Sequence, residues 1–260
     1  MLNAVAPSAT LPLGRYAVIA TPDLDEARDE VARIFCPHRL HLGHGQASFD
    51  ARHHVAPLGE ISLNYVQYGA EVDIDPGCLG DFYLLQIPLR GSARIDWAGR
   101  SFTSDVHRAS LASPSKPLRM CWGDDTPHLI VKIATAVVQR HWASLCGEPA
   151  DDRPLEFEPA IALDEGAGAS VKHLVDFLAQ ELSCGRTTLT TPFLAQAESA
   201  LIHTLLGQLP HNQSERLRAG HGDVAPRALR RARDYIEAHL TDALTVDEIA
   251  SASGLCVRSL

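Results

Sequence analysis

Histidine is the residue type whose number and spacing in this sequence most directly suggest chemistry. The chain holds 13 histidines, and five of them fall between residues 38 and 54. Imidazole nitrogens bind zinc, iron and manganese, so a metal site is the first hypothesis to test. The five residues are His38, His41, His44, His53 and His54.

The spacing of these histidines argues against a metal site. The chain has no HxH pair, the arrangement with which metal-dependent β-barrel enzymes hold an ion. His53 and His54 are adjacent on an expected strand, so their side chains point to opposite faces. The other three lie in a glycine-containing loop. We therefore expect solvated or hydrogen-bonded histidines, with no metal and no cofactor.

Motifs for covalent or phosphate chemistry are also missing. The sequence has no GxSxG, no Walker A motif and no GxGxxG. The six cysteines form no CxxC pair, so neither a disulfide framework nor a zinc ribbon is indicated. We expect no catalytic residues and no enzyme.

A small-molecule pocket has better support from the residue types. Apolar walls with a few convergent polar groups are the usual lining of such a site. The Arg94 guanidinium could pair with a carboxylate, which makes an organic acid one candidate ligand. Each residue could instead be an ordinary core aromatic or a surface arginine. The candidates are Tyr65, Tyr83, Gln86, Arg94 and Trp122.

The end of the sequence has the pattern of two helices joined by a tight turn. Thr245 and Glu248 form an S/T-x-x-E capping box at the start of one helix. Gly254 follows where a sharp turn needs a residue that tolerates positive φ. Apolar residues restart at Leu255, Val257 and Leu260, so a second helix is expected to begin after the turn and to be incomplete at the last residue. An ordinary helical hairpin would show the same pattern.

An arginine-rich helix is expected before this pair. Pro226 suits a first helical position, and Leu229, Ala232 and Ile236 follow at helical spacing. Arginines in its first two turns, and polar residues at the start of the last helix, could contact DNA phosphates or bases. A solvated helix face is the alternative. The candidates are Arg227, Arg230, Arg231, Arg258 and Ser259.

The rest of the chain divides into segments that differ in the spacing of their apolar residues. Residues 23–35 are amphipathic with a helical period, whereas 47–134 alternate with period two between glycines and prolines. Many short antiparallel strands, closed or nearly closed into a barrel, are the expectation. Helices are expected over 135–208, where two apolar faces at 171–182 and 193–206 either cover the barrel or form a dimer interface.

Composition sets the broad class. The chain has 260 residues, 45% of them apolar, and a net charge of −9. The longest apolar run is far short of the roughly eighteen residues of a membrane helix, and no signal peptide is evident. A cytoplasmic location is the default. Residues 226–260 hold equal numbers of basic and acidic residues, so the acidic excess belongs to 1–225 and charge alone does not argue for DNA.

Two resemblances combine these observations. Residues 226–260 resemble the start of the DNA-binding domain of the AraC/XylS family of transcription regulators, with Cys256 where the family usually has a capping serine. The stretch from DLDEAR through GDFYLLQIPLRGSARI to LLGQLPHNQSERL, about residues 20–218, resembles the AraC-binding-like N-terminal domain.

The resemblance implies an α+β fold: a cupin-like antiparallel β-barrel at about 47–134 with flanking helices, then an all-α fragment. Residues 1–218 would form a domain for sensing a ligand and for dimerisation, and residues 219–225 would be the linker. Residues 226–260 would be a partial helix-turn-helix DNA-binding domain, truncated inside its recognition helix.

The function implied is a ligand-responsive bacterial transcription regulator that acts as an activator. Its partners would be promoter DNA, a small-molecule effector, RNA polymerase and a second copy of itself. The alternatives are a cupin-like metal-dependent enzyme and a sensing or dimerisation module that binds no DNA.

Overall fold

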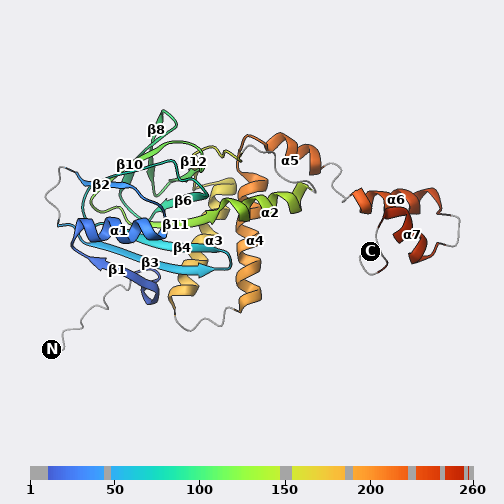
Figure 1. Cartoon of the computed structure of the whole chain (residues 1–260), viewed down its shortest axis with the longest axis horizontal. Helices are drawn as coiled ribbons and strands as arrows, with labels where there is room; N and C mark the ends of the chain where they lie inside the picture. Colours follow the sequence, from blue (N-terminus) through green and yellow to red (C-terminus); the bar gives the residue numbers. More distant parts are fainter. Residues whose placement is uncertain are drawn as a thin grey trace.

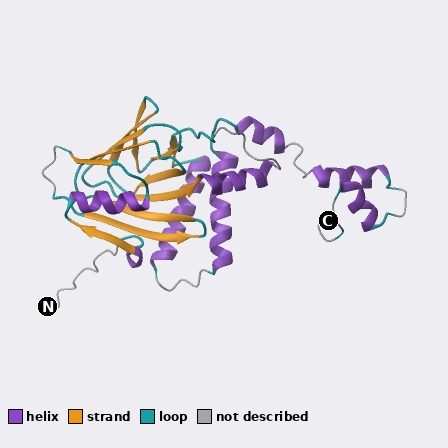
Figure 2. Cartoon of the chain, in the orientation of Figure 1, coloured by secondary structure: helices purple, strands orange, loops and turns teal. Residues whose placement is uncertain are grey.

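The protein has a mixed α+β structure in which an antiparallel sheet of twelve strands is accompanied by helices (Figures 1 and 2). The computed structural model describes residues 11–43, 48–146, 154–184, 190–221, 227–240, 244–254 and 257. Seven α-helices lie within these residues. The α+β class expected from the sequence is confirmed.

Every described strand pairing is antiparallel, as the period-two pattern predicted. A short 3-10 helix, η1 (Gly14–Tyr16), precedes the first strand. The strands are β1 (Ala17–Thr21), β2 (Arg39–Leu42), β3 (Ala51–Leu58), β4 (Ile61–Gln67), β5 (Val72–Gly77), β6 (Phe82–Pro88), β7 (Ser92–Trp97), β8 (Arg100–Asp105), β9 (Arg108–Ala112), β10 (Leu118–Trp122), β11 (His128–Ala134) and β12 (Ala160–Ala162).

The sheet folds over into two facing layers. The strand order is β1-β3-β4-β11-β6-β9-β8-β7-β10-β5-β2, with β12 added beside β9. Strands β8 and β9 pair only at Asp105 and Arg108, beside their connecting turn. The first layer therefore runs from β1 to β9 and the second from β8 to β2. Buried residues of both layers, such as Leu84 and Ile95, form one apolar cluster between them.

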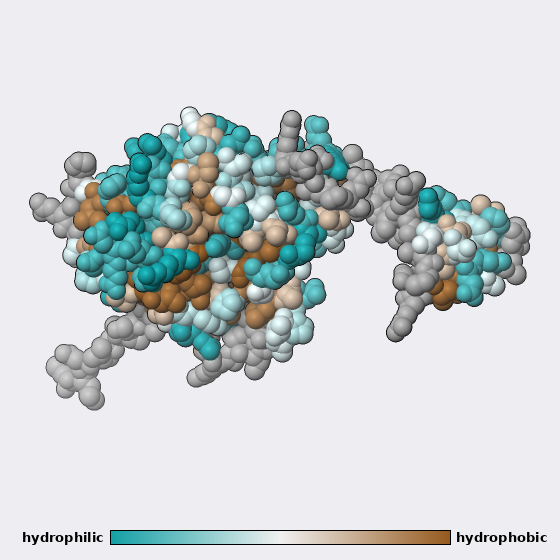
Figure 3. All heavy atoms as spheres, in the orientation of Figure 1, coloured by the Kyte–Doolittle hydropathy of each residue, from teal (hydrophilic) through white to brown (hydrophobic). Residues whose placement is uncertain are grey.

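The sheet is open between its edge strands β1 and β2, so of the two expected forms, a closed or a nearly closed barrel, the closed form is wrong. Helix α1 (Leu24–Ile34) contacts β1 and β3 at one edge and β2 at the other. The helix thus covers the seam that direct pairing would otherwise close. Charged residues of α1 face solvent, and Figure 3 shows hydrophilic side chains gathered over this helix.

Strand β6 is buried along its whole length because both of its faces are covered. Phe82 and Leu84 belong to the cluster between the layers, whereas Leu85 and Ile87 belong to a second cluster on the opposite face. A strand buried on both faces has a continuous apolar sequence instead of an alternating one. The stretch FYLLQIP has this character.

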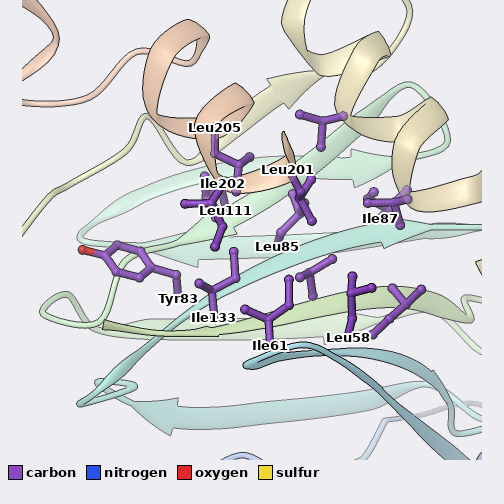
Figure 4. Close-up of a cluster of buried hydrophobic side chains, with 14 of the residues drawn as sticks. Leu58, Ile61, Tyr83, Leu85, Ile87, Leu111, Ile133, Leu201, Ile202 and Leu205 are labelled. Atoms are coloured by element: carbon purple, nitrogen blue, oxygen red, sulfur yellow. The ribbon is translucent and has the colours of Figure 1, made fainter. Parts of the chain in front are cut away.

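Three helices cover the outer face of the first layer: α2 (Thr135–Cys146), α3 (Gly166–Ser183) and α4 (Thr191–Gln208). Figure 4 shows Leu85 and Leu111 of the sheet pointing toward Leu201 and Ile202 of α4. These side chains are almost fully buried. Burial of one such side chain stabilises the fold by about 1.5–3 kcal/mol, so the apolar face of α4 serves to cover the sheet.

The end of the chain folds as a separate helix pair. Helix α5 (Ser214–His221) comes first, so the linker expected at 219–225 begins inside a helix, and residues 222–226 lie outside the described residues. Helices α6 (Arg227–Ala238) and α7 (Val246–Ser253) then pack against each other. Ala232 and Ala250 are both buried, and their small side chains let the two helices approach closely.

Candidate functional site

A small apolar cavity lies between the two sheet layers, beneath the end of α1. Its volume is about 40 Å³. Phe35 and His38 enter from the segment that follows α1, and the two layers supply the remaining walls. The strands, and the turns that follow β4 and β5, contribute Val66, Tyr68, Ile74, Pro76, Leu79, Phe82, Leu84, Gln86, Met120, Trp122 and Ile130.

Three polar atoms among these walls are buried without a hydrogen-bond partner in the described part of the chain. They are Nε2 of His38, Oε1 of Gln86 and Nε1 of Trp122. Leaving a buried donor or acceptor unpaired costs about 1–3 kcal/mol. These atoms are enclosed by neighbouring side chains, and the exposed surface of the cavity itself is almost wholly apolar.

The ionisable groups of the cavity are held in their neutral forms. Burial raises the pKa of the Cys36 thiol and of the Tyr68 phenol. Burial lowers the pKa of His38, although its hydrogen bond to the Cys36 carbonyl acts in the opposite direction. The cavity therefore has an apolar surface, and none of the ionisable side chains that line it carries a charge at neutral pH.

Two buried histidines pack against aromatic residues of the cavity wall. His128 stacks on Trp122 with ring centroids 3.7 Å apart, and burial lowers its pKa to about 3. His53 stacks on Phe35 at 5.3 Å, and burial lowers its pKa to about 4. Its Nε2 lies 3.1 Å from Oδ1 of Asn64. Both imidazoles are therefore uncharged at neutral pH.

Side-chain contacts stabilise both ends of helix α1, and the one at its C-terminal end ties the helix to the sheet. The Asp23 carboxylate accepts from the Glu26 amide at 2.9 Å and caps the first turn. At the other end, the Lys132 ammonium donates to the Ile34 carbonyl at 2.6 Å and lies 4.8 Å from the centre of the Phe82 ring. A cation at a helix C-terminus also interacts favourably with the helix dipole.

The structure brings together two of the five residues proposed for the pocket. Gln86 and Trp122 both line the cavity. Tyr65 and Tyr83 face the covering helices instead, where the Tyr83 hydroxyl donates to the Leu155 carbonyl at 2.9 Å. Arg94 lies outside the sandwich.

The surroundings of Arg94 form a charged hollow on the outer face of the second layer. The side chain is 65% exposed, and its Nε lies 3.5 Å from the Asp96 carboxylate. The hollow, of about 330 Å³, also contains Asp75 and Arg119, which pair at 3.2 Å. Its arginines are thus partly neutralised by neighbouring aspartates.

The clustered histidines of the sequence are dispersed in the fold. His38 lines the cavity, whereas His41 lies beside the charged hollow and His44 lies outside the described residues. His53 faces between the layers, and His54 faces away, its Nδ1 2.6 Å from the Pro12 carbonyl. Within the described ranges, no three histidine, cysteine, aspartate or glutamate side chains gather closely enough to hold a metal ion.

The expected capping box and turn are present in the helix pair. The Thr245 hydroxyl accepts from the Glu248 amide at 3.3 Å, and the Glu248 carboxylate accepts from the Thr245 amide at 2.9 Å. Gly254 ends α7 with φ of 75°, in the left-handed region. These two sequence predictions are confirmed.

Three of the five proposed DNA-contact residues lie on α6. Arg231 is exposed, and one of its guanidinium nitrogens would lie 3.9 Å from a Cβ placed on Gly254. Arg227 and Arg230 belong to the same helix, but their side chains lie outside the described residues, as do Arg258 and Ser259 entirely. The described geometry places a cationic group beside the turn of the helix pair.

The sequence analysis did not select several cavity residues that the fold brings together. Phe35, Tyr68 and Met120 come from three separate segments. In a sequence, apolar residues of this kind cannot be distinguished from ordinary core residues. The period-two alternation therefore could not identify them as cavity residues. His38 was noted only as a possible metal ligand.

Comparisons with known proteins agree with this architecture. A model of the AraC-binding-like domain family matches residues 27–207. A probable thc operon regulatory protein of Rhodococcus erythropolis is 30% identical over 243 residues, covering 92% of this chain and 72% of that protein. The AraC-like transcriptional activator CuxR superposes with a TM-score of 0.54 at 12% identity, over 94% of this chain and 86% of that one.

The chain thus joins a sheet sandwich to a capped helix pair. The chain belongs to the AraC family of transcription regulators, and residues 27–207 are its AraC-binding-like domain. Among the described residues, no helix is both long enough and apolar enough to cross a membrane.

Proposed function

We propose that the protein is a cytoplasmic transcription regulator whose activity responds to a small molecule bound between the sheet layers. The observation that carries this proposal is the combination, in one chain, of a lined internal cavity and a capped helix pair bearing exposed positive charge. The domains we propose are 1–218 for sensing and dimerisation, a short linker at 219–225, and 226–260 for DNA contact.

DNA binding is proposed to run through the arginines of α6 and the start of the helix that the sequence predicts after α7. Arg227, Arg230, Arg231, Arg258 and Ser259 are the contacts that we propose. Each phosphate neutralised by a cationic side chain adds about 0.9 to the slope of log affinity against log salt concentration.

The test is to titrate the 260-residue chain with a random-sequence duplex at several salt concentrations. Replacing Arg231 with alanine should lower the slope by about 0.9. Arg233→Ala is the matched control because that guanidinium already lies 3.7 Å from Glu237 and 3.8 Å from Asp234. If the slope drops in Arg233→Ala and not in Arg231→Ala, the DNA contact lies on another face of α6.

A homodimer is proposed through the exposed side of α3 and α4. Phe177 is 46% exposed and Phe193 is 39% exposed, and their ring centroids lie 6.5 Å apart. They come from neighbouring helices and form one apolar patch. Partly exposed large apolar side chains that adjoin in this way are typical of protein contact sites. Leu201 and Leu205 are buried against the sheet and cannot serve this interface.

We further propose, from the family resemblance, that the regulator activates transcription together with RNA polymerase. A reporter gene placed under a bound promoter should then rise when the chain is expressed, and a fall would mean repression.

We also propose that the protein is not an enzyme. One nitrogen of each interior imidazole is already engaged, His53 at Asn64 and His128 at the Thr126 carbonyl, which supports a structural role for these two residues. Stoichiometric iron, manganese or zinc in protein purified without a His-tag would instead favour the metal-dependent enzyme.

A further inference from the structure

Two histidines and a buried glutamate lie together where α2 packs against α4, on the outer face of the first sheet layer (Figure 1). His141 comes from α2, whereas Glu198 and His203 come from α4. We propose that these three residues form a proton-sensitive joint. It holds α2 against α4 while the two imidazoles carry at most one positive charge between them, and it opens when both are protonated.

The carboxylate of Glu198 is the negative charge of this joint. Its side chain is only 7% exposed. Oε2 accepts from the backbone N–H of Glu60 in the β3–β4 turn, where a Cβ on Gly59 would collide with it. Oε1 lies 3.9 Å from Nε2 of His141. A buried carboxylate is costly without a cationic partner, and His141 is the basic side chain that faces it.

The two nitrogens of His141 face different groups. Nε2 faces Glu198, and Nδ1 lies 3.1 Å from Nε2 of His203. The two rings meet edge to face with centroids 5.0 Å apart. An imidazolium donates from both nitrogens, so a charged His141 can donate to the carboxylate and to a neutral His203 at once. With both rings neutral, His203 can donate to His141 instead, and the contact is kept.

A second proton does not fit this geometry. Both facing nitrogens would then carry hydrogen, so the hydrogen bond between the rings would be lost and two positive charges would adjoin. Burial lowers the pKa of His203, and the neighbouring His141 lowers it further. Protonation of both rings therefore favours their separation.

Other ionisable groups surround the joint. The side chains of Arg140 and Glu60 pair with each other at the surface, where they are 54% and 63% exposed. The described groups on the other elements packed against α4 are Lys172, His173, Asp176 and Glu181 on α3, Glu215 and Arg216 on α5, His211 before α5, and His54 on β3. Among these described side chains, none contributes to the lowered pKa of His203.

The position of the joint connects it to the rest of the chain. Helix α4 continues through a short loop into α5, and the chain then reaches the helix pair. Leu201 and Leu205 hold the other side of α4 on the sheet, so opening is confined to the contact with α2. Acid would therefore loosen the covering helices next to the segment that leads to the proposed DNA contact.

The test follows the histidine rings of the ¹³C-labelled 260-residue chain by NMR, from about pH 8 to about pH 5. The nuclear Overhauser effect between the rings of His141 and His203 should be present at the higher pH and fade as both rings become protonated. Once the contact is broken, the His203 ring regains the ordinary pKa of about 6.5. The ratio of open to closed chains should thus rise up to about tenfold for each pH unit below that value.

Two variants should move the titration midpoint of His203 in opposite directions. His141→Gln removes the neighbouring positive charge, so the midpoint should rise. Glu198→Gln removes the negative charge at nearly the same size, so the midpoint should fall. Glu60→Gln is the matched control and should leave the midpoint unchanged, because that carboxylate is exposed and already paired with Arg140. Far-UV circular dichroism verifies that each variant is folded, and the ring contact in the unaltered chain needs no variant.

Two outcomes would overturn the inference. A ring contact that persists after both rings are protonated would show that the second proton does not open the joint. A His203 midpoint that stays in place in His141→Gln would show that the two rings do not titrate as a pair. Both measurements are made without DNA, so their result is independent of the proposed DNA contact.

Discussion

At the scale of single residues, the interior between the sheet layers contains buried histidines that carry no charge at neutral pH. His53 and His128 are buried between the layers, and burial lowers the pKa of each well below 6.5, to about 4 and about 3. Hydrogen bonds to the neutral rings fix their orientation: His53 meets Asn64, and His128 meets the Thr126 carbonyl at 2.9 Å. The fold therefore depends on both rings remaining unprotonated.

This dependence predicts acid sensitivity. Below pH 6.5 the unfolded imidazoles bind protons, whereas the folded rings with pKa values of about 4 and 3 do not. The free energy of unfolding should consequently fall as the pH drops from 6.5 toward 4, by about 1 kcal/mol per histidine for each pH unit. Urea unfolding of the 260-residue chain at pH 7.0, 6.0 and 5.0 would measure this loss.

A pair of variants assigns the effect. Asparagine at position 128 keeps a donor for the Thr126 carbonyl and removes the titrating ring, so His128→Asn should flatten the pH dependence while lowering stability at pH 7. His107→Asn is the control, because His107 is exposed and its hydrogen bond to Asp164 raises its pKa. An equally steep loss in His128→Asn would show that other groups cause the acid sensitivity.

At the scale of elements, the local signals in the sequence were reliable where one short segment decides the structure. The capping box and the left-handed glycine of α7 depend on residues 245–254 alone, and both are present. Helix α1 (Leu24–Ile34) likewise falls within the expected 23–35.

The strand faces show where sequence reasoning reaches its limit. Tyr83 and Gln86 belong to one strand, and period two correctly implies that they face opposite sides. Because both sides of β6 are buried, the pattern cannot tell which side faces the cavity and which faces the helices. For Arg94 the signal was present: Ala93 and Ile95 alternate with it and are buried, so the arginine had to face outward.

Local sequence patterns also could not predict whether the sheet closes into a barrel. Whether edge strands β1 and β2 pair depends on what occupies the seam, and here helix α1 contacts both edges. No short-range feature of either strand encodes that arrangement. The order of strands follows from long-range packing.

The cap of α7 supports a prediction at this scale. Replacing Thr245 with alanine removes the oxygen that accepts from the Glu248 amide and should cost about 1 kcal/mol of stability in the helix pair. Hydrogen exchange of the α7 amides should accelerate about fivefold, while the sheet amides stay unchanged. Thr245→Ser keeps a hydroxyl and is the control. Equal acceleration in both variants would mean that the hydroxyl is not what holds the helix start.

At the scale of the whole molecule, the covering helices have two faces with different roles. One face of α4, including Leu201 and Leu205, is buried in the cluster that it forms with the sheet. The other side of the α3–α4 pair exposes Phe177 and Phe193, which contact each other edge to face. Stability of the monomer and assembly of two copies should therefore respond to different substitutions.

The last prediction separates these two roles. Phe177→Ser together with Phe193→Ser should convert a dimer into a monomer in sedimentation velocity at tens of micromolar, with little change in urea unfolding of the monomer. Leu201→Ala should instead lower the free energy of unfolding by about 2–5 kcal/mol, because it opens a cavity in the cluster under α4. Dimer formation stabilises the folded state by mass action, so the stability of a dimer depends on protein concentration. The double serine variant should lose this concentration dependence, and Leu201→Ala should keep it. An unaltered chain that sediments as a monomer would refute the dimer, and a double serine variant that still dimerises would place the interface on another surface.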